Sequence, residues 1–494
     1  MKKFTRLFMV MMLFAMTSTI YAQTITGIVN ADDGPLPGAS VTVKGNTIGT
    51  TTDFDGKFSL KVPEGNGVLT VSFIGFTSKE INYSVAAGET KDLGTILLAS
   101  DLKLDEIVIT ATSFAIDRKT PVAVSTIRAV TIEHKLGSQE FPEILKSTPG
   151  VYATKSGGGF GDGRLNLRGF NSENVAVMIN GVPVNDMENG RVYWSNWAGL
   201  ADVTSAMQVQ RGLGASKVAV PSIGGTVNIL SKTTDIEKGG NFFVGVGNDG
   251  YQKYGATVST GLLDNGFAAT VSAAKTKGNG YVDGTEFEGY NYFVNISKQI
   301  GDNHKLSLTS FGAPQRHGQR QNTSTIETYR NAESGRKFNP DWGIKDGKVV
   351  HVEDNFYHKS QTSLNHYWTI SDKSDLSTSL YASWGTGGGG GAAGDYSLFN
   401  VRLGGSDQPM DLDHIVDVNR ANGALGSVAY LRASRNDHEW YGMLSTFKTE
   451  LNDNLHLVAG VDLRTYTGKH FSEVTDLLGG AYVLENSDVN NPDR

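Results

Sequence analysis

Three short patterns contain residue types that could support chemistry, and each has a simpler structural explanation. Asp53-Phe54-Asp55-Gly56 places two carboxylates as a calcium loop does, but the other ligands of such a loop are missing, which favours a hairpin turn. Gly385–Gly394 contains the spacing of a dinucleotide-binding loop, yet it begins no helix, which favours a flexible outer loop. His438-Glu439 lacks the second histidine of a zinc protease site. We therefore expect no enzyme activity, no metal and no cofactor.

A fourth group of residues is aromatic and could bind a small molecule without catalysis. The segment Asn189–Trp197 contains Arg191, Tyr193, Trp194 and Trp197. Such rings can stack on a bound ligand, or they can pack against the protein that surrounds them. The sequence leaves both interpretations open, and these four residues are our candidate ligand-binding residues.

The composition narrows the class of protein. The 494 residues include 60 glycines, which suit the turns and bulges of β structure. There is no cysteine, so disulfides and thiolate chemistry are excluded. A formal net charge of −7 argues against nucleic acid as a partner, because nucleic acid favours a basic surface.

The first 22 residues have the pattern of a secretory signal peptide. Lys2, Lys3 and Arg6 precede the apolar run Leu7–Ile20, and Ala22 is a small residue suited to a cleavage point. The alternative is an N-terminal membrane anchor. We expect export, with residues 1–22 removed.

Residues 23–99 predict a small β-sandwich, because about seven short runs rich in β-branched and aromatic residues alternate with turn clusters. The expected strands are Thr24–Val29, Ala39–Val43, Ile48–Thr52, Lys57–Leu60, Val68–Phe73, Phe76–Tyr83 and Leu93–Leu97. Residues 114–235 predict a mixed α/β domain. It should contain a helical turn at Glu140–Lys146 and strands at Arg164–Leu167, Val175–Ile179 and Val203–Gln210.

From residue 238 the pattern changes to the longer strands of a transmembrane antiparallel β-barrel. Apolar and polar residues alternate, as they do when one strand face meets lipid and the other faces the barrel interior. Short turns alternate with longer connections near 275–289, 314–360 and 387–439, as expected for periplasmic turns and outer loops. An aromatic girdle is expected at the strand ends, from Tyr290, Trp368, Trp384 and Tyr441.

The barrel of residues 238–494 is expected to be incomplete. We count about nine strands, whereas plugged outer-membrane transporters have 22. The sequence ends in a polar run, Asn486–Arg494, and not in a strand. Residues 23–494 alone should then give no heat-modifiable barrel. The alternative is that strands inside 314–360 and 387–439 escape recognition.

Several stretches of the sequence resemble known families. Ile25–Leu60 is similar to the carboxypeptidase regulatory-like domain. Residues 102–113 resemble a TonB box, which implies that Asp105, Glu106, Ile107, Val108, Ile109 and Thr110 bind TonB. Their β-branched side chains favour addition as a strand to a partner's sheet edge, and a terminal strand of the sandwich is the alternative.

The domain at 114–235 resembles the plug of the TonB-dependent receptors. The similar stretches are Leu145–Val151, Leu167–Phe170, Ile179–Val184, Val209–Gly212 and Gly224–Lys232. The plug residues that match the motifs are Arg168, Gly169, Arg211, Gly212, Gly224, Gly225 and Asn228. The resemblance implies that both arginines face acidic residues of the barrel, and solvated turn arginines are the alternative. Leu213–Ser222 departs from the family's pattern and leaves the shape of that loop open.

The resemblance implies active import of a scarce nutrient across the outer membrane. Siderophore, cobalamin, haem, glycan and peptide all remain as substrates. The implied partners are TonB with its inner-membrane energising complex, outer-membrane lipid and, as a further candidate, a substrate-binding lipoprotein. A passive porin or an adhesin is the rival interpretation, but neither needs a plug or a TonB box.

Overall fold

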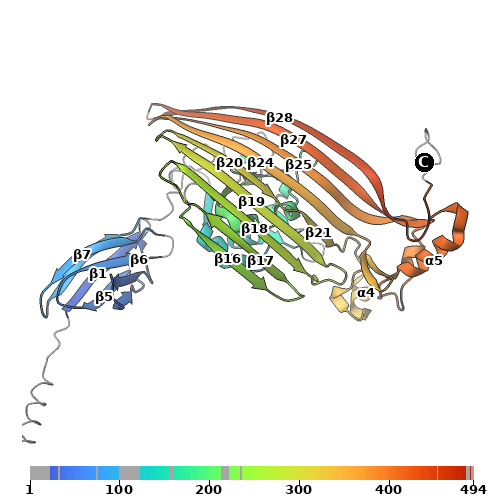
Figure 1. Cartoon of the computed structure of the whole chain (residues 1–494), viewed down its shortest axis with the longest axis horizontal. Coiled ribbons are helices and arrows are strands. Elements are labelled where there is room, and N and C mark those ends of the chain that lie inside the picture. Colours follow the sequence, from blue (N-terminus) through green and yellow to red (C-terminus); the bar gives the residue numbers. More distant parts are fainter. Residues whose placement is uncertain are drawn as a thin grey trace, which may run out of the picture. The chain divides into compact units, whose positions relative to one another are not determined.

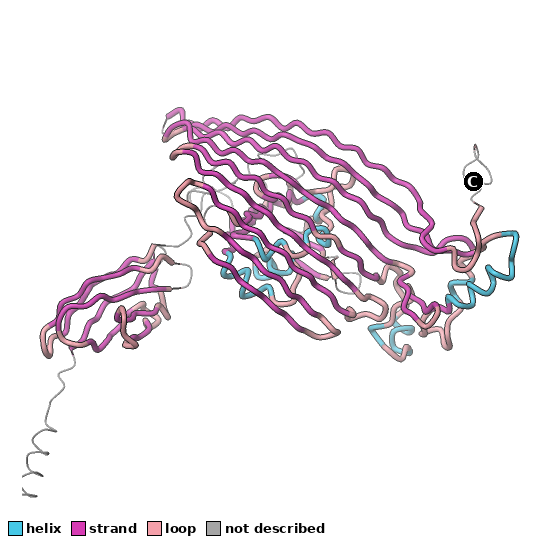
Figure 2. Tube along the Cα trace, in the orientation of Figure 1, coloured by secondary structure: helices cyan, strands magenta, loops and turns pink. Residues whose placement is uncertain are grey.

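The computed structural model describes residues 23–31, 34–73, 76–99, 123–155, 160–161, 163–212, 222–233, 236–452, 454–484 and 490. It divides into two compact units, Met1–Asp105 and Glu106–Arg494. Strands dominate both units (Figure 1, Figure 2). No helix in the described ranges is long and apolar enough to cross a membrane.

The first unit is a sandwich of two four-stranded sheets, and all seven predicted strands are present. One sheet contains β2 (Gly34–Pro35), β1 (Gln23–Ala31), β5 (Lys57–Val62) and β8 (Thr90–Leu97). The other contains β4 (Gly49–Thr51), β3 (Ser40–Val43), β6 (Gly65–Ser72) and β7 (Lys79–Val85). Alternate residues of β1 are buried, and Ile25, Val41 and Leu69 lie at the centre of a core that both sheets share.

The second unit begins with the plug domain, whose main sheet has five strands. Their order is β13 (Val182–Pro183), β12 (Val175–Ile179), β15 (Gly225–Ser231), β14 (Thr204–Arg211) and β9 (Ala123–Arg128). A separate hairpin pairs β10 (Val151–Thr154) with β11 (Arg164–Leu167). The helical elements are α3 (Ala129–Leu136), η1 (Phe141–Ser147), η2 (Ser172–Asn174), η3 (Trp194–Trp197) and η4 (Leu200–Val203). The helical turn expected at Glu140–Lys146 is the 3-10 helix η1, and α3 was not predicted.

Nine long strands follow, all antiparallel to their neighbours. Their order is β16 (Gly239–Val246), β17 (Gln252–Ser259), β18 (Phe267–Gly278), β19 (Phe287–Ile300), β20 (His304–Gly312), β24 (Asp354–Ser371), β25 (Ser374–Gly394), β27 (Ala429–Asn452) and β28 (Leu455–Asp476). The short β21 (Gln315–Gly318) continues β20, because both pair with β19 and β24. The expected count of about nine is confirmed. Figure 1 shows the sheet in front of the plug.

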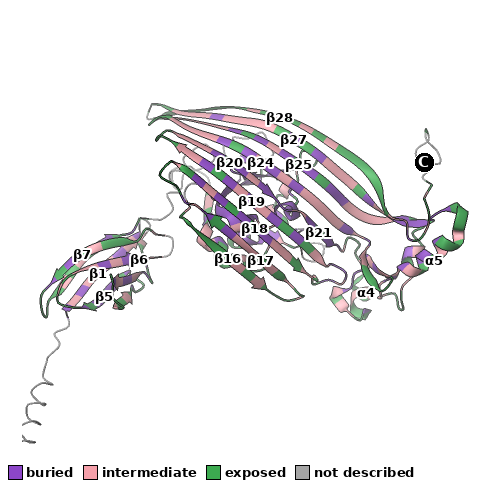
Figure 3. Ribbon diagram, viewed as in Figure 1, coloured by how far each residue is buried: buried purple, intermediate pink, exposed green. Residues whose placement is uncertain are grey.

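Burial alternates along these strands as the barrel pattern predicts (Figure 3). Val258 is 61% exposed, whereas its neighbours Thr257 and Ser259 are each 6% exposed and face the interior. At the outer end Trp384 donates from Nε1 to the hydroxyl of Tyr441 at 3.0 Å. Trp384 pairs with Ser360, which lies eight residues before Trp368 on β24. That separation is roughly 26 Å along a strand, or about 20 Å along the membrane normal at the usual strand tilt of about 40°.

The structure corrects the prediction of a flexible loop at Gly385–Gly394. This run is the outer half of β25 and pairs with β24 on one side and β27 on the other. The glycines make room for large neighbours. A Cβ on Gly385 would lie 2.4 Å from Nε2 of His438, and one on Gly390 would lie 2.2 Å from a carboxylate oxygen of Asp354. The glycines of this run therefore allow side chains of the neighbouring strands to pack closely against β25.

The two longest connections are shorter than expected, because strands continue into both ends of them. β24 begins inside 314–360, while β25 and β27 extend into 387–439. The remaining outer residues form α4 (Ile326–Asn331), η5 (Gly335–Lys337), β22 (Trp342–Lys345), β23 (Lys348–His351), η6 (Leu398–Asn400), β26 (Met410–Asp411), α5 (Leu412–Asn422) and η7 (Gly423–Leu425). The pairing of strands by their backbones needs no hydrophobic alternation, which explains why the sequence pattern misses these extensions.

Candidate functional site

A shared core holds the plug against the barrel strands. The buried cluster of the plug includes Trp197 and also Phe293 of β19 and Phe311 of β20. The rings of Trp197 and Phe311 stack with centroids 6.0 Å apart. A buried ion pair joins Asp202 of η4 to Lys253 of β17 at 2.6 Å. The plug is therefore packed against the inner face of the sheet.

The plug loop of residues 185–197 is built by its own side chains. Asn185 accepts from the backbone of Val177 at 2.8 Å and donates to the carbonyls of Val175 and Gly190 at 2.9 Å each. Asp186 accepts from the backbone N–H groups of Glu188 and Asn189 at 3.0 and 3.1 Å. These bonds tie the loop to β12 and fix its shape before any ligand arrives.

The loop is also joined to the last strand of the sheet. Glu188 accepts hydrogen bonds from Nε2 of His470 at 2.8 Å and from the hydroxyl of Tyr466 at 3.0 Å. The hydrogen bond from His470, followed by that from Tyr466, holds the pKa of Glu188 below its ordinary value. Burial acts in the opposite direction but is weaker than the two hydrogen bonds together. The loop thus carries an anchored carboxylate at the barrel wall.

A cavity of about 290 Å³ lies between this loop and the inner faces of β24, β25, β27 and β28, and we call it the lysine cavity. It is lined by Asp186, Arg191, Tyr193, Trp197, Tyr357, Lys359, Asn436, His438 and His470, among others. More than half of the residues that line it come from strands that lie more than 150 residues after the plug loop in the sequence. Its volume is at the lower end of the range for small-molecule sites.

The four candidate ligand-binding residues of the plug loop differ in their exposure and in whether they line the lysine cavity. Arg191 and Tyr193 are exposed, Arg191 pairs with Glu173 at 2.7 Å, and both line the lysine cavity. Trp197 also lines it, although it is 1% exposed. Trp194 is buried against Phe141, with ring centroids 5.4 Å apart, and does not line this cavity. Trp194 therefore packs against Phe141 and borders two other cavities, while the other three residues border the lysine cavity.

Sequence reasoning missed the barrel side of the cavity. Tyr357 donates to the carbonyl of Asn436 at 2.9 Å and contacts Nδ1 of His438 at 3.1 Å. The sequence considered His438 only as part of a zinc motif. Strand alternation could have placed Tyr357 and Lys359 on one inward face, but no local signal shows which inward residues meet the plug.

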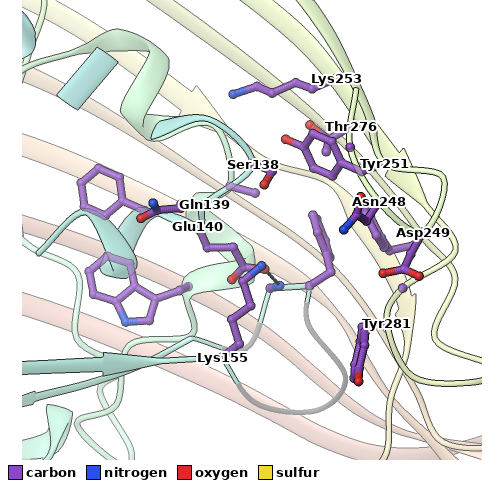
Figure 4. Close-up of a pocket in the computed structure, with 18 of the residues that line it drawn as sticks. Ser138, Gln139, Glu140, Lys155, Asn248, Asp249, Tyr251, Lys253, Thr276 and Tyr281 are labelled. Carbon is purple, nitrogen blue, oxygen red and sulfur yellow. Dashed lines mark hydrogen bonds between the residues drawn. The ribbon is translucent and has the colours of Figure 1, made fainter. Parts of the chain in front are cut away.

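A second, wider cavity of about 690 Å³ lies between the plug and the outer ends of the first strands (Figure 4). We call it the tyrosine cavity, after Tyr251 and Tyr281. Its charged side chains already have partners. Lys253 pairs with Asp202, Asp249 pairs with Lys337 at 3.5 Å, and Lys155 pairs with Glu143 at 3.6 Å. The lysine cavity is therefore the better candidate for recognition of a polar ligand.

The plug motif residues have structural roles in the described part of the chain. Gly225 has a φ of +140°, and a Cβ there would lie 2.2 Å from the carbonyl oxygen of Gln210. Asn228 is fully buried and accepts from the backbone of Gly181 at 3.3 Å. The remaining motif positions, Gly169, Gly212 and Gly224, lie at the turns beside these strands.

Arg168 directly follows the plug strand β11, and Arg211 is the last residue of β14. Within the described ranges, neither Arg168 nor Arg211 takes part in an ion pair with an acidic residue of the barrel. Arg211 instead donates to the carbonyl of Pro149 at 3.3 Å, and a Cβ on Gly212 would lie 2.4 Å from Nη1 of Arg168. Arg168 is thus exposed in a turn and Arg211 ends β14, and their pairing with acidic residues of the barrel stays a prediction.

Four segments singled out in the sequence lie wholly or mostly outside the described residues: the signal peptide at 1–22, the TonB-binding segment Asp105–Thr110, the loop Leu213–Ser222 and the terminal run Asn486–Arg494. No group of three or more histidine, aspartate or glutamate side chains is arranged to hold a metal ion in the ranges that the structure describes.

Two family models match the sequence. The model of the CarboxypepD_reg-like domain matches residues 25–109, and the model of the TonB-dependent receptor plug domain matches residues 117–226. The first match includes Asp105–Ile109, which keeps open the alternative that this segment belongs to the sandwich.

Parts of the chain are similar to known receptors and transporters. TonB-dependent receptor P39 of Formosa agariphila is 29% identical over 237 residues, which are 46% of this chain and 21% of the relative. The vitamin B12 transporter BtuB of Photobacterium profundum is 27% identical over 44% of this chain and 36% of that protein. The chain therefore spans well under half the length of these relatives. The structure of FpvA of Pseudomonas aeruginosa, in complex with iron and a heterologous pyoverdine, has a TM-score of 0.53 at 12% identity and covers 72% of this chain and 44% of FpvA.

Proposed function

Because this chain carries the plug domain of the TonB-dependent receptors behind a carboxypeptidase regulatory-like domain, we propose that it serves TonB-dependent import of a scarce nutrient across the outer membrane. The packing of the plug against the inner face of the long strands is the observation that carries the proposal. A passive pore or an adhesin would have no use for a plug that closes its interior. Siderophores, cobalamin, haem, glycans and peptides are the substrate classes under consideration.

The proposed partners are TonB and its inner-membrane energising complex, with outer-membrane lipid around the strands. We assign TonB binding to Asp105–Thr110. A segment of this composition can add as a strand to a partner's sheet, so that backbone hydrogen bonds transmit a pulling force. The first plug strand after it, β9, pairs with β14 and lies at the edge of the plug sheet as far as the described residues show. Force on the segment would first load the pair of Ala123 with Arg211.

Ile107→Pro tests this assignment. Proline removes a backbone N–H donor and fixes φ, so strand addition to TonB should fail and uptake should fall to the background level. Ile107→Val keeps the donor and the β-branched shape and should transport at nearly the normal rate. The measurement is uptake of labelled nutrient by cells that make the full-length receptor, beside equilibrium binding at the cell surface.

The rival assignment makes residues 105–109 the last strand of the sandwich. In that case Ile107→Pro should lower the melting temperature of the sandwich and leave uptake unchanged. Normal transport by the proline variant would therefore remove the coupling role from this segment. Loss of surface binding together with uptake would indicate failed assembly, which antibody detection of the receptor in outer membranes would reveal.

A further inference from the structure

Lys359 occupies an unusual position in the lysine cavity. It lies on the inward face of β24 and is 4% exposed. Its ammonium nitrogen lies between two indole rings, 5.8 Å from the centroid of Trp197 of the plug and 5.4 Å from that of Trp440 of β27. No hydrogen bond or ion pair within 4.0 Å engages this ammonium in the part of the chain that the structure describes.

A buried ammonium without a partner is costly, since it has lost its hydration and gained no equivalent hydrogen bond. The two indole faces compensate for part of that loss. They cannot accept the three hydrogen bonds that an ammonium donates. A group that binds in the cavity and accepts those bonds would remove the deficit.

The two arginines and His470 of the cavity wall already have carboxylate partners. Arg191 pairs with Glu173 at 2.7 Å, and Arg435 pairs with Glu473 at 2.5 Å. His470 donates to Glu188 at 2.8 Å. Lys359 is thus the cation of this wall whose donors are free, within the described ranges.

The groups around Lys359 are mainly hydrogen-bond acceptors, which a ligand would have to meet with hydrogen-bond donors. Tyr357 uses its only hydroxyl proton on the carbonyl of Asn436, so Nδ1 of His438 must donate to the Tyr357 oxygen. Nε2 of the neutral imidazole is then an acceptor, and it has no partner. The side-chain oxygens of Asn196 and Asn436 are buried without partners as well. Asp186 adds a carboxylate to the same wall.

From this arrangement we propose that the lysine cavity binds its ligand through an acid group, carboxylate or sulfate, placed against Lys359. Hydroxyl or N–H donors of the same ligand meet the acceptors of Asp186, Asn196, Asn436 and His438. The proposal rests on the proposed import function, for which it names the class of substrate: a small acidic molecule, or an acidic unit of a larger one, that also carries several hydrogen-bond donors.

Sugar acids and amino acids both have this chemistry, and matched probes distinguish them. The full-length receptor, purified in detergent, is titrated by calorimetry with glucuronate against glucose and with alanine against alaninamide. We expect at least one acid to bind tenfold or more tightly than its counterpart without a carboxylate. A preference confined to glucuronate identifies hydroxyl donors, and one confined to alanine identifies an ammonium donor.

Lys359→Met and Lys359→Gln should reduce that preference to less than twofold, whereas Lys359→Arg should keep most of it. Lys373→Met is the matched control, because Lys373 is exposed at the turn between β24 and β25 and should keep the full preference. Near-ultraviolet circular dichroism checks that Trp197 and Trp440 keep their environment in each variant. Equal binding of each acid and its counterpart without a carboxylate by the unaltered protein would overturn the proposal, and so would a preference that survives in Lys359→Gln.

These titrations contain no TonB, so their outcome does not depend on coupling. Failure of the import function would leave the acid preference in place and abolish only the effect of Ile107→Pro on uptake. If instead the lysine cavity shows no preference for an acid, Ile107→Pro should still abolish uptake.

Discussion

Glu143 is the clearest case in the plug of a buried charge with a complete set of partners. It is 5% exposed, and Lys146 approaches it at 2.5 Å while Lys155 lies 3.6 Å away. Its second oxygen accepts from the backbone of Glu140 at 3.0 Å, which closes a capping box at the start of η1. Burial alone would raise the pKa of Glu143. The hydrogen bonds from Lys146 and Glu140, with the charge of Lys155, instead hold the pKa below its usual value.

This depressed pKa makes the stability of the plug depend on pH. A carboxyl whose folded pKa lies below its unfolded value stabilises the fold above the unfolded pKa, about 4.3 for glutamate. That contribution is lost as the pH falls through the folded pKa. Glu143→Gln should therefore destabilise the segment 141–154 by roughly 1–3 kcal/mol at pH 7, as loss of charged hydrogen bonds does. The variant and the unaltered protein should differ less at pH 3 than at pH 7, because part of the carboxylate is then protonated.

Hydrogen exchange of residues 141–154 at the two pH values measures this difference. Glu327→Gln is the control, because Glu327 is exposed on α4 and lies outside the plug. Equal protection of the segment in Glu143→Gln and in the unaltered protein at pH 7 would show that the carboxylate contributes nothing to plug stability.

At the scale of elements, β25 shows how a glycine run can be an ordered strand. Its inward positions lie opposite large side chains of β24 and β27, and Lys359 pairs in register with Gly385. A Cβ on Gly385 would lie 2.4 Å from His438 and 2.5 Å from the Tyr357 hydroxyl, both of which line the lysine cavity. The absence of a side chain at Gly385 is therefore what lets Tyr357 and His438 meet beneath it.

Gly385→Ala should consequently displace Tyr357 and His438 and destabilise the protein by about 1–3 kcal/mol, the usual cost of overpacking. Gly391→Ala on the same strand is the matched control, because its nearest neighbour would be Glu353 at an ordinary distance of 3.5 Å. Neither glycine has a positive φ, so alanine strains neither backbone. Thermal unfolding of the two purified variants compares them, and an equal effect of both substitutions would contradict this account of the strand.

At the scale of the whole molecule, the sandwich and the plug with its strands have separate cores. The sandwich buries sixteen hydrophobic residues in one cluster, and none of them belongs to the cluster that joins plug and barrel. The chain also divides into two compact units at this place, Met1–Asp105 and Glu106–Arg494. Independent cores of this size are what single domains require.

Residues 23–99 expressed alone should accordingly fold as a cooperative sandwich. We expect a well-dispersed amide spectrum and a single thermal transition. A broad, non-cooperative melt would show that the sandwich depends on the rest of the chain. Phe58→Ala, which removes a core ring, should lower the stability of this fragment by about 3–5 kcal/mol, whereas Phe54→Ala at an exposed turn should have almost no effect.

Much of this architecture was predictable from local pattern. The strands Arg164–Leu167 and Val175–Ile179 agree with β11 and β12 residue for residue, and the alternation around Val258 correctly placed apolar side chains outside. Such predictions succeed because a strand with one buried face must repeat every second residue. The outer half of β25 has no such repeat, since glycine carries no side chain, and so only its pairing with β24 and β27 identified it as a strand.

The candidate site depended on tertiary structure in a different way. The sequence alone marked the aromatic segment Asn189–Trp197 as notable, but it could not separate Trp194, which packs on Phe141, from Tyr193, which borders the lysine cavity. It also carried no sign that Lys359 would meet that segment, which lies more than 150 residues away. Strand periodicity states whether a side chain points inward. What lies opposite is set by the register of the strands and the seating of the plug, and both are determined by packing of the folded chain.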